Sequence, residues 1–367
     1  MRRNLALCLL LGLGILIVDC VPQLALTTPA PDMGVHLLVK ATGDLSHKRP
    51  GWEKYLPLSF GTALDRDDLL RAGSDAEGLI VCADLSLAEM PPGYHGGLPC
   101  PQAEPILRRG ENLVVGPQRD AAMLSSIPYV LSPRHTFIQT EHPLLRWYPY
   151  ATEAITYTVQ VWGQDLDWQT ETIATELCYP NDAPLLKPNK SYHLTVTDNE
   201  GCSSKEEQTA LDLSFALLPS ERVGIVQALV AQAQDLGLDD PAVRLLEAEI
   251  YVAYGLRADA IAVLEKLTTE EEAPAVQRRL GDLYLEVGLY TEARTAYERA
   301  LAGYRTLGDQ VGEAATLTGL GLAYWGNEDD GTAQHRLEQA RDLYEALGDA
   351  EGVERVKGTL GKMGGGQ

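Results

Sequence analysis

Six cysteines are the residues of this chain whose spacing most directly suggests chemistry. Two of them lie in the first twenty positions, and the other four fall into two local pairs, Cys82 with Cys100 and Cys178 with Cys202. An even number of cysteines in an exported chain favours disulfides. We therefore predict the disulfides Cys82–Cys100 and Cys178–Cys202, each closing a loop of about 20 residues and contributing about 3 kcal/mol in the chain-entropy model. The alternatives are four buried thiols or a zinc site, and the absence of CxxC and of nearby clustered histidines disfavours zinc.

The other chemically active residue types show no pattern of a catalytic or metal site. The seven histidines are scattered, without the spacing that puts two ligands on one face. There is no Gly-x-Ser-x-Gly elbow, and the run Gly358-x-x-Gly361-Lys362 is too short for a phosphate-binding loop. The acidic runs at 65–68 and 327–330 lack the 12-residue calcium pattern, so we interpret them as surface turns. We expect no enzymatic activity, no metal and no other cofactor.

The charge balance disfavours nucleic acid as a partner. The chain has 30 Lys and Arg against 52 Asp and Glu, a formal net charge of −22. Nucleic-acid phosphates are bound mainly by basic side chains. An acidic surface keeps a protein soluble and can attract basic partners or divalent cations weakly.

The first residues resemble an export signal. Met-Arg-Arg-Asn precedes an apolar run from Leu5 to Val18. Positive charges before such a run are typical of a secretory signal, and the run is shorter than the roughly 20 residues that span a membrane. We predict that residues 1–25 are a cleaved signal peptide, with an uncleaved anchor or a lipid on Cys20 as alternatives. Each option places the rest of the chain outside the cytoplasm, in the periplasm or cell envelope, and an anchor or lipid would associate it with a membrane.

Composition divides the remaining chain into two parts. Residues 34–217 hold most of the prolines and short alternating runs, whereas residues 221–367 are rich in Ala, Leu and Glu. The run 155–161 alternates with period two, which places Ile155, Tyr157, Val159 and Val161 on one face of a strand. We predict a multidomain fold with an all-β N-terminal half followed by an α-helical half.

Residues 34–120 resemble the FecR-like domain, a set of short strands with a long loop. The resemblance is carried by a Gly-x-x-Leu-x-x-x-Asp-x-Leu core, which here consists of Gly61, Leu64, Asp68 and Leu70. After this core the family usually has a basic or polar residue followed by Thr, whereas this chain has Arg71-Ala72. In the family this domain belongs in part to proteins that sense signals outside the membrane.

Residues 133–217 resemble an immunoglobulin-like β-sandwich of the fibronectin type III kind. A proline and a tryptophan precede the alternating run, and Leu-x-Pro then leads into Tyr192-x-Leu-x-Val. The resemblance implies that Trp147 lies in the core and that Tyr192 is the corner tyrosine.

The last third of the chain repeats itself. Leu280-Gly281-x-x-Tyr284 recurs 40 residues later as Leu320-Gly321-x-x-Tyr324, and Leu360-Gly361 follows. Matched small and large residues follow the first two copies: Ala293, Tyr297 and Ala300, then Ala333, Leu337 and Ala340. A fixed period of this size indicates a solenoid of helix pairs.

These residues resemble the tetratricopeptide repeat, with about three copies and a partial one in 221–367. The first-helix Trp of the family is absent, since Arg244, Gln277 and Leu317 stand there. The resemblance implies a concave groove that binds a protein or peptide. The residues carried over onto this groove are Glu249, Arg278, Asp282, Glu286, Leu322 and Trp325. Trp325 is either an exposed hot-spot residue or a cap on the short solenoid.

We therefore predict a non-enzymatic, extracytoplasmic scaffold or adaptor that binds protein or peptide partners through its helical repeats. The alternative is an envelope signal-sensing or saccharide-binding protein that acts through the FecR-like domain.

Overall fold

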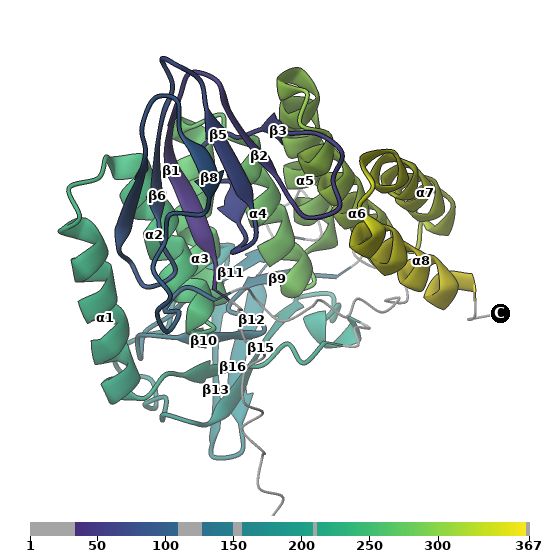
Figure 1. Cartoon of the computed structure of the whole chain (residues 1–367). Helices are drawn as coiled ribbons and strands as arrows, with labels where there is room; N and C mark the ends of the chain where they lie inside the picture. The colour runs from purple at the N-terminus through teal and green to yellow at the C-terminus, as the bar shows by residue number, and fades with distance from the viewer. Residues whose placement is uncertain (1–33, 109–126, 150–155, 208–210, 365–367) are drawn as a thin grey trace, which may run out of the picture. The chain divides into compact units, whose positions relative to one another are not determined.

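The β-rich part begins with short strands that form two antiparallel four-stranded sheets (Figure 1). In a computed structural model of the chain, the described residues are 34–108, 127–149, 156–207 and 211–364, and the structural statements below refer to them. The sheets have the strand orders β4-β1-β6-β7 and β3-β2-β5-β8. The strands are β1 His36–Thr42, β2 Leu45–Lys48, β3 Leu56–Pro57, β4 Ala63–Leu64, β5 Leu69–Ala72, β6 Glu77–Val81, β7 Leu87–Met90 and β8 His95–Gly97. The predicted signal segment, residues 1–25, lies outside the described residues.

The Gly-Leu-Asp-Leu core of this first β unit has a packing role. Leu64 and Leu70 are fully buried between the sheets. Gly61 has a φ of +83°, and a Cβ there would lie 2.9 Å from Cγ2 of Val276 in the helical part. Both the backbone conformation and the close approach therefore require glycine at this position.

Asp68 closes the turn between β4 and β5. Its side chain is fully buried, and its carboxylate accepts hydrogen bonds from the Asp65 backbone N at 2.9 Å and from Arg49 Nε at 3.2 Å. Burial alone would raise the pKa of Asp68, but the hydrogen bond from the His47 ring and the Arg49 charge hold that pKa below its ordinary value. The acidic run at 65–68 thus forms the predicted turn, which this ionised carboxylate stabilises.

The second β unit contains a five-stranded sheet, β10-β16-β15-β12-β13, and a three-stranded sheet, β14-β11-β9. Its strands are β9 Tyr129–Ser132, β10 Thr136–Ile138, β11 Leu144–Tyr148, β12 Tyr157–Gly163, β13 Leu166–Thr172, β14 Glu176–Cys178, β15 Ser191–Asp198 and β16 Phe215–Leu217. A short 3-10 turn, Ser204–Glu206, follows β15.

The core of this second unit contains the residues that the sequence predicted. Trp147 is 2% exposed, and Tyr192 is fully buried with its hydroxyl accepting a hydrogen bond from the Lys187 backbone N at 2.9 Å. The alternation in β12 is also confirmed, because Tyr157, Val159 and Val161 are buried. Ile155 lies outside the described residues.

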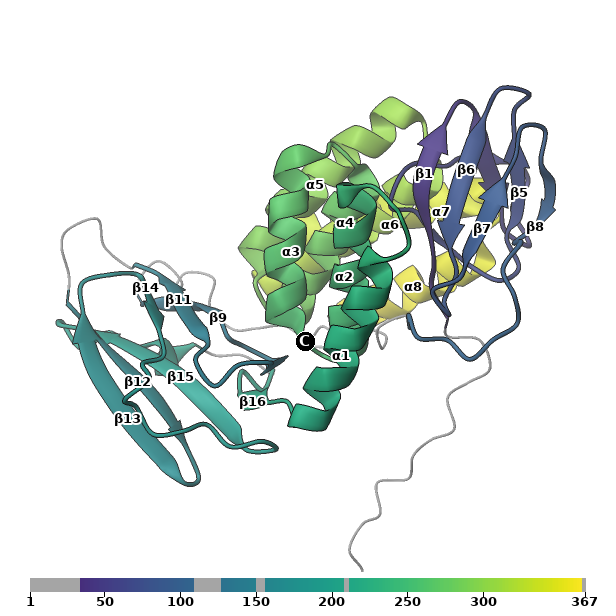
Figure 2. The same ribbon diagram turned by 90° about the vertical axis from the view of Figure 1, so that its left-hand side faces the viewer.

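Eight consecutive helices make up the C-terminal part, and the predicted fold class is confirmed. They are α1 Ser220–Gln234, α2 Asp240–Ala253, α3 Arg257–Glu270, α4 Pro274–Glu286, α5 Tyr290–Leu307, α6 Gln310–Gly326, α7 Asp330–Leu347 and α8 Ala350–Gly364. Successive helices lie side by side (Figure 2). None of the described helices combines the length and apolar character needed to cross a bilayer.

The repeated Leu-Gly-Asp turns end one helix and begin the next. Gly308 and Gly348 follow α5 and α7 with φ values of +70° and +75°, the left-handed conformation that glycine adopts without strain. Asp309 then caps α6, since its Oδ1 accepts hydrogen bonds from the backbone N atoms of Val311 and Gly312 at 3.1 and 2.9 Å.

The repeated glycines also set how closely neighbouring helices pack. A Cβ on Gly281 would lie 2.8 Å from the Tyr297 ring, and a Cβ on Gly321 would lie 2.6 Å from Leu337 Cγ. The same pair of positions therefore forms the same contact in two repeats. This confirms that the small residues lie where the paired helices are closest.

Both β units contact the helices. In the first, Trp52 is 3% exposed and packs with Leu347 of α7. In the second, the Tyr129 hydroxyl donates to Gly288 O at 2.8 Å and Arg134 Nε donates to Val287 O at 2.7 Å. Side chains of both units join the main helical core.

Candidate functional site

Two residues predicted for the groove are buried in the solenoid. Glu249 on α2 is 4% exposed, and its carboxylate receives two hydrogen bonds from Arg279 on α4, at 2.6 and 2.9 Å. Trp325 on α6 is 5% exposed and belongs to the main core. Of the two alternatives for Trp325, the exposed hot-spot residue is therefore wrong, because Trp325 is buried in the core whereas Tyr324 beside it is only half-buried. Glu249 is a packing residue that links helix α2 to helix α4.

Three other predicted groove residues are held by partners inside the chain. Arg278 Nη1 pairs with Asp282 Oδ2 at 3.0 Å, one turn away on α4. The Tyr297 hydroxyl donates to Asp282 Oδ1 at 2.7 Å. Glu286 Oε2 accepts from Arg257 Nε at 2.9 Å. These contacts join α4 to α3 and α5 and occupy the charged groups.

Leu322, the last residue predicted for the groove, is half-buried on α6 and packs against the main core. The six predicted residues are thus spread over α2, α4 and α6, and they do not line a common hollow among those described.

The structure places hollows elsewhere, between the second β unit and helices α3 to α5. One of about 210 Å³ lies against the β9–β11 segment, and one of about 400 Å³ lies along α3, α4 and α5. They share the lining residues Tyr148, Glu265, Tyr284 and Glu292. We call the two hollows together the acidic cleft.

The hydrogen bonds of Glu265 fix one wall of the acidic cleft. The Tyr284 hydroxyl donates to Glu265 Oε1 at 2.7 Å, and Arg146 Nη1 lies 3.7 Å from Glu265 Oε2. Burial and then the Glu265 charge raise the pKa of Tyr284, so its hydroxyl stays protonated and donates. Glu265 therefore accepts a hydrogen bond from Tyr284 and lies beside the guanidinium of Arg146.

Two further carboxyl groups of the cleft belong to half-buried residues and have no comparable partner among the described residues. Burial raises the pKa of Asp259 on α3 to about 6, opposed by a hydrogen bond from Gln139 Nε2 at 3.3 Å. Burial also raises the pKa of Glu292 on α5, and Glu292 Oε2 has no hydrogen-bond partner among the described residues. A buried carboxylate is unfavourable without hydrogen bonds or an opposite charge. A cation that binds beside either carboxylate would therefore stabilise it.

Gln277 on α4 adds an uncharged acceptor to the cleft. Its side chain is 8% exposed and lines the larger hollow, and its Oε1 accepts no hydrogen bond from the described residues. In the sequence, Gln277 stands out only as the residue that replaces the Trp of the repeat family. The cleft itself was missed because its residues come from β11 and three helices, and no sequence period relates them.

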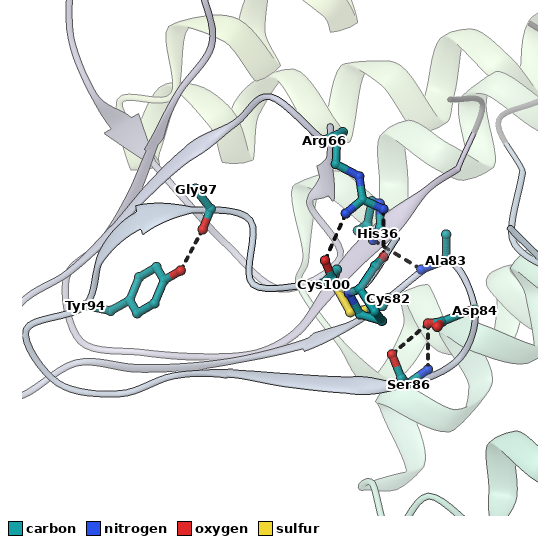
Figure 3. The surroundings of a disulfide bond; sticks show 10 residues. His36, Arg66, Cys82, Ala83, Asp84, Ser86, Tyr94, Gly97 and Cys100 are labelled. Atoms are coloured by element: carbon teal, nitrogen blue, oxygen red, sulfur yellow. Dashed lines mark hydrogen bonds between the residues drawn. A yellow bond between two sulfur atoms is a disulfide. The ribbon is translucent and has the colours of Figure 1, made fainter. Parts of the chain in front are cut away.

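The predicted disulfide Cys82–Cys100 is present, with 5.6 Å between the Cα atoms (Figure 3). Both cysteines are buried. Arg66 Nη1 donates to Cys100 O at 2.9 Å, and the Ala83 backbone N donates to His36 Nδ1 at 3.2 Å. In the part of the chain described, His36 and these two sulfurs are the only three potential metal ligands that lie together, and the sulfurs are bonded to each other.

The predicted disulfide Cys178–Cys202 is wrong. Both cysteines are free, and Cys178 is exposed, so the alternative of buried thiols is also wrong for it. Cys178 ends β14 in the three-stranded sheet, whereas Cys202 follows β15 of the five-stranded sheet. Closeness in sequence was therefore not sufficient to predict a bond between these two residues.

Comparison with known proteins identifies the helical repeats. Residues 272–346, which contain α4 to α6 and most of α7, match the tetratricopeptide repeat. BtubC (BKLC) from P. vanneervenii is 19% identical over 39% of this chain and 72% of its own, with a TM-score of 0.29. The nearly identical TPR-like repeats described as a kinesin light chain from Podosopora anserina are 24% identical over 33% of this chain and 68% of their own, with a TM-score of 0.28. No curated protein matches the chain. The repeat prediction is confirmed, and the FecR-like resemblance and the signal segment stay predictions.

Proposed function

We propose that this chain, with its tetratricopeptide-repeat region, is a scaffold that holds a peptide or protein segment in the acidic cleft. The observation that carries the proposal is the hollow of about 400 Å³ along α3, α4 and α5. Stacked helical repeats bury a continuous core and present an extended surface on which such proteins bind partners. The hollow opens on the surface of the helices, where Thr291, Thr295 and Arg299 are exposed, and a segment can occupy it.

The side chains of the cleft favour binding over catalysis. The lining residues include tyrosines, threonines and carboxylates, with no cysteine or histidine among them. They offer hydrogen-bond donors and acceptors for a segment. A non-enzymatic role is the proposal that agrees best with this set.

An extracytoplasmic location is part of the proposal. The disulfide Cys82–Cys100 supports it, because disulfides persist in oxidising compartments. The basic and apolar first residues support it as an export signal. If residues 1–25 remain as an anchor, they would also associate the chain with a membrane.

A site-specific crosslink tests the proposed function. Thr295 and Thr306 are both exposed threonines of α5, and only Thr295 lines the cleft. A photo-crosslinking residue at Thr295 of the full chain should join it to a partner polypeptide in the envelope fraction of the source cells. The same residue at Thr306 should give no such product. Absence of a product at Thr295, or equal products at both positions, would overturn the proposal.

A further inference from the structure

We propose that the acidic cleft selects segments that carry a lysine or arginine, whose cationic head group binds between Gln277 and Glu292. The inference rests on the proposed function and names the chemistry of the partner.

The first argument is a shortage of hydrogen-bond donors in the cleft. Gln277 Oε1 and Glu292 Oε2 are both buried, and both lack a donor among the described residues. The two residues line the same hollow, one from α4 and one from α5. An acceptor left unsatisfied in the interior destabilises the protein. An ammonium brings three N–H donors and a guanidinium five, with no acceptor, so either head group can satisfy both oxygens.

The second argument is the charge around Glu292. The charges of Arg134 and Arg294 lower the pKa of Glu292, and the charge of Glu265 acts in the opposite direction. Arg134 is already paired with Glu207 at 2.7 Å, and Arg294 lies over the Tyr324 ring, 5.6 Å from its centroid. The charge of Glu292 therefore remains open to an external cation.

The other charges of the cleft leave this preference in place. Arg146 faces Glu265, and Asp259 adds a second carboxyl group with only an amide partner. Arg299 lines the larger hollow together with Gln277 and Glu292, but it is exposed to solvent, whereas Gln277 Oε1 and Glu292 Oε2 are buried. Because Glu292 lacks an ion-pair partner among the described residues, an anionic side chain would meet unfavourable charge beside it in the larger hollow.

The third argument is the shape of the walls. Tyr148 and Tyr284 line both hollows, so an entering side chain passes aromatic rings. Lysine and arginine combine an apolar stem with a charged head, and a cation is attracted to an aromatic face.

Peptide binding to the full chain tests the inference. Fluorescein-labelled hexa-arginine and hexa-lysine are titrated with the protein, and fluorescence anisotropy reports the affinity. Glu292→Gln should weaken binding about ten-fold, the loss expected for one charge-assisted hydrogen bond. Gln277→Leu, which removes the second acceptor, should weaken it as well. Hexa-glutamate should show no binding.

The matched control is Glu354→Gln, which removes one negative charge from an exposed position on α8. It should change the affinity less than two-fold. Equal losses in Glu292→Gln and Glu354→Gln would show that the peptides follow only the net charge, and would overturn the inference. Circular dichroism should show all variants folded, since Glu292→Gln removes a buried carboxyl that lacks a hydrogen bond at Oε2.

The crosslink at Thr295 separates the two proposals. A partner segment captured there that carries no lysine or arginine at the crosslinked site would overturn the selection of cations and leave the scaffold function standing. A captured segment with such a residue would support both.

Discussion

Asp259 is the residue at which burial most clearly changes the chemistry of the cleft. Its pKa is raised from 3.8 to about 6, chiefly by burial. The folded state therefore binds this proton more tightly than the unfolded chain does. The protonated form stabilises the fold fully below the unfolded pKa, and this contribution is lost as the pH rises through about 6. In the wild type, this titration lowers the free energy of unfolding by up to about 3 kcal/mol between acid and neutral pH. We predict that Asp259→Asn abolishes this part of the pH dependence.

Urea denaturation from pH 4 to pH 7 measures this contribution as the difference between wild type and variant. Asp342→Asn is the control, because Asp342 is exposed and pairs with its neighbour Arg341 on the surface of α7. Its pH dependence should follow that of the wild type. If Asp259→Asn shows the wild-type slope as well, Asp259 is not the group that titrates.

Single residues also show where prediction from the sequence ends. The pattern around Trp147 and Tyr192 was sufficient, since a large aromatic residue at such a place is usually core. Trp325 could not be predicted in the same way. A helical period shows which residues share a face, but burial of a second face depends on neighbouring elements that the period does not describe.

At the scale of elements, helix α3 has no capping hydrogen bond from its own N-cap side chain. A strand of the second β unit supplies one instead, because Thr136 Oγ1 on β10 accepts from the Ala258 backbone N at 3.2 Å. We predict that Thr136→Val destabilises the protein by about 1 kcal/mol, the typical cost of a lost cap. Urea denaturation measures this cost, and hydrogen exchange should show a less protected Ala258 amide. The control Thr306→Val, at an exposed position of α5, should change the free energy of unfolding by no more than about 0.5 kcal/mol. An equally small effect of Thr136→Val would contradict a capping role.

Elements and repeats could be predicted because their signals are local and occur more than once. Gly308 and Gly348 have the same conformation because the same Leu-Gly-Asp sequence surrounds both. Closeness in sequence predicted the bond Cys82–Cys100 correctly, but the same reasoning failed for Cys178 and Cys202, which also belong to one β unit. The acidic cleft and the free state of Cys178 were not predictable, because each depends on which sheets and helices become neighbours across long stretches of chain.

At the scale of the whole molecule, Arg134 links the second β unit to the repeats. It is 1% exposed, donates to Val287 O at the end of α4, and pairs with buried Glu207 at 2.7 Å. Arg134→Met would leave the Glu207 carboxylate and the Val287 carbonyl without their donors, so we predict a loss of about 3–5 kcal/mol in the free energy of unfolding.

Arg134→Met should also separate the unfolding of the second β unit from the unfolding of the helices. Urea denaturation followed by tryptophan fluorescence, which includes Trp147, and by helical circular dichroism should give coincident transitions for the wild type. The two transitions should separate in Arg134→Met. Arg341→Met, which removes an exposed ion pair on α7, should lower the free energy of unfolding by at most about 1 kcal/mol and keep the transitions coincident. Coincident transitions with an unchanged midpoint in Arg134→Met would show that the apolar contacts of Tyr129 and its neighbours hold the β unit to the repeats without this ion pair.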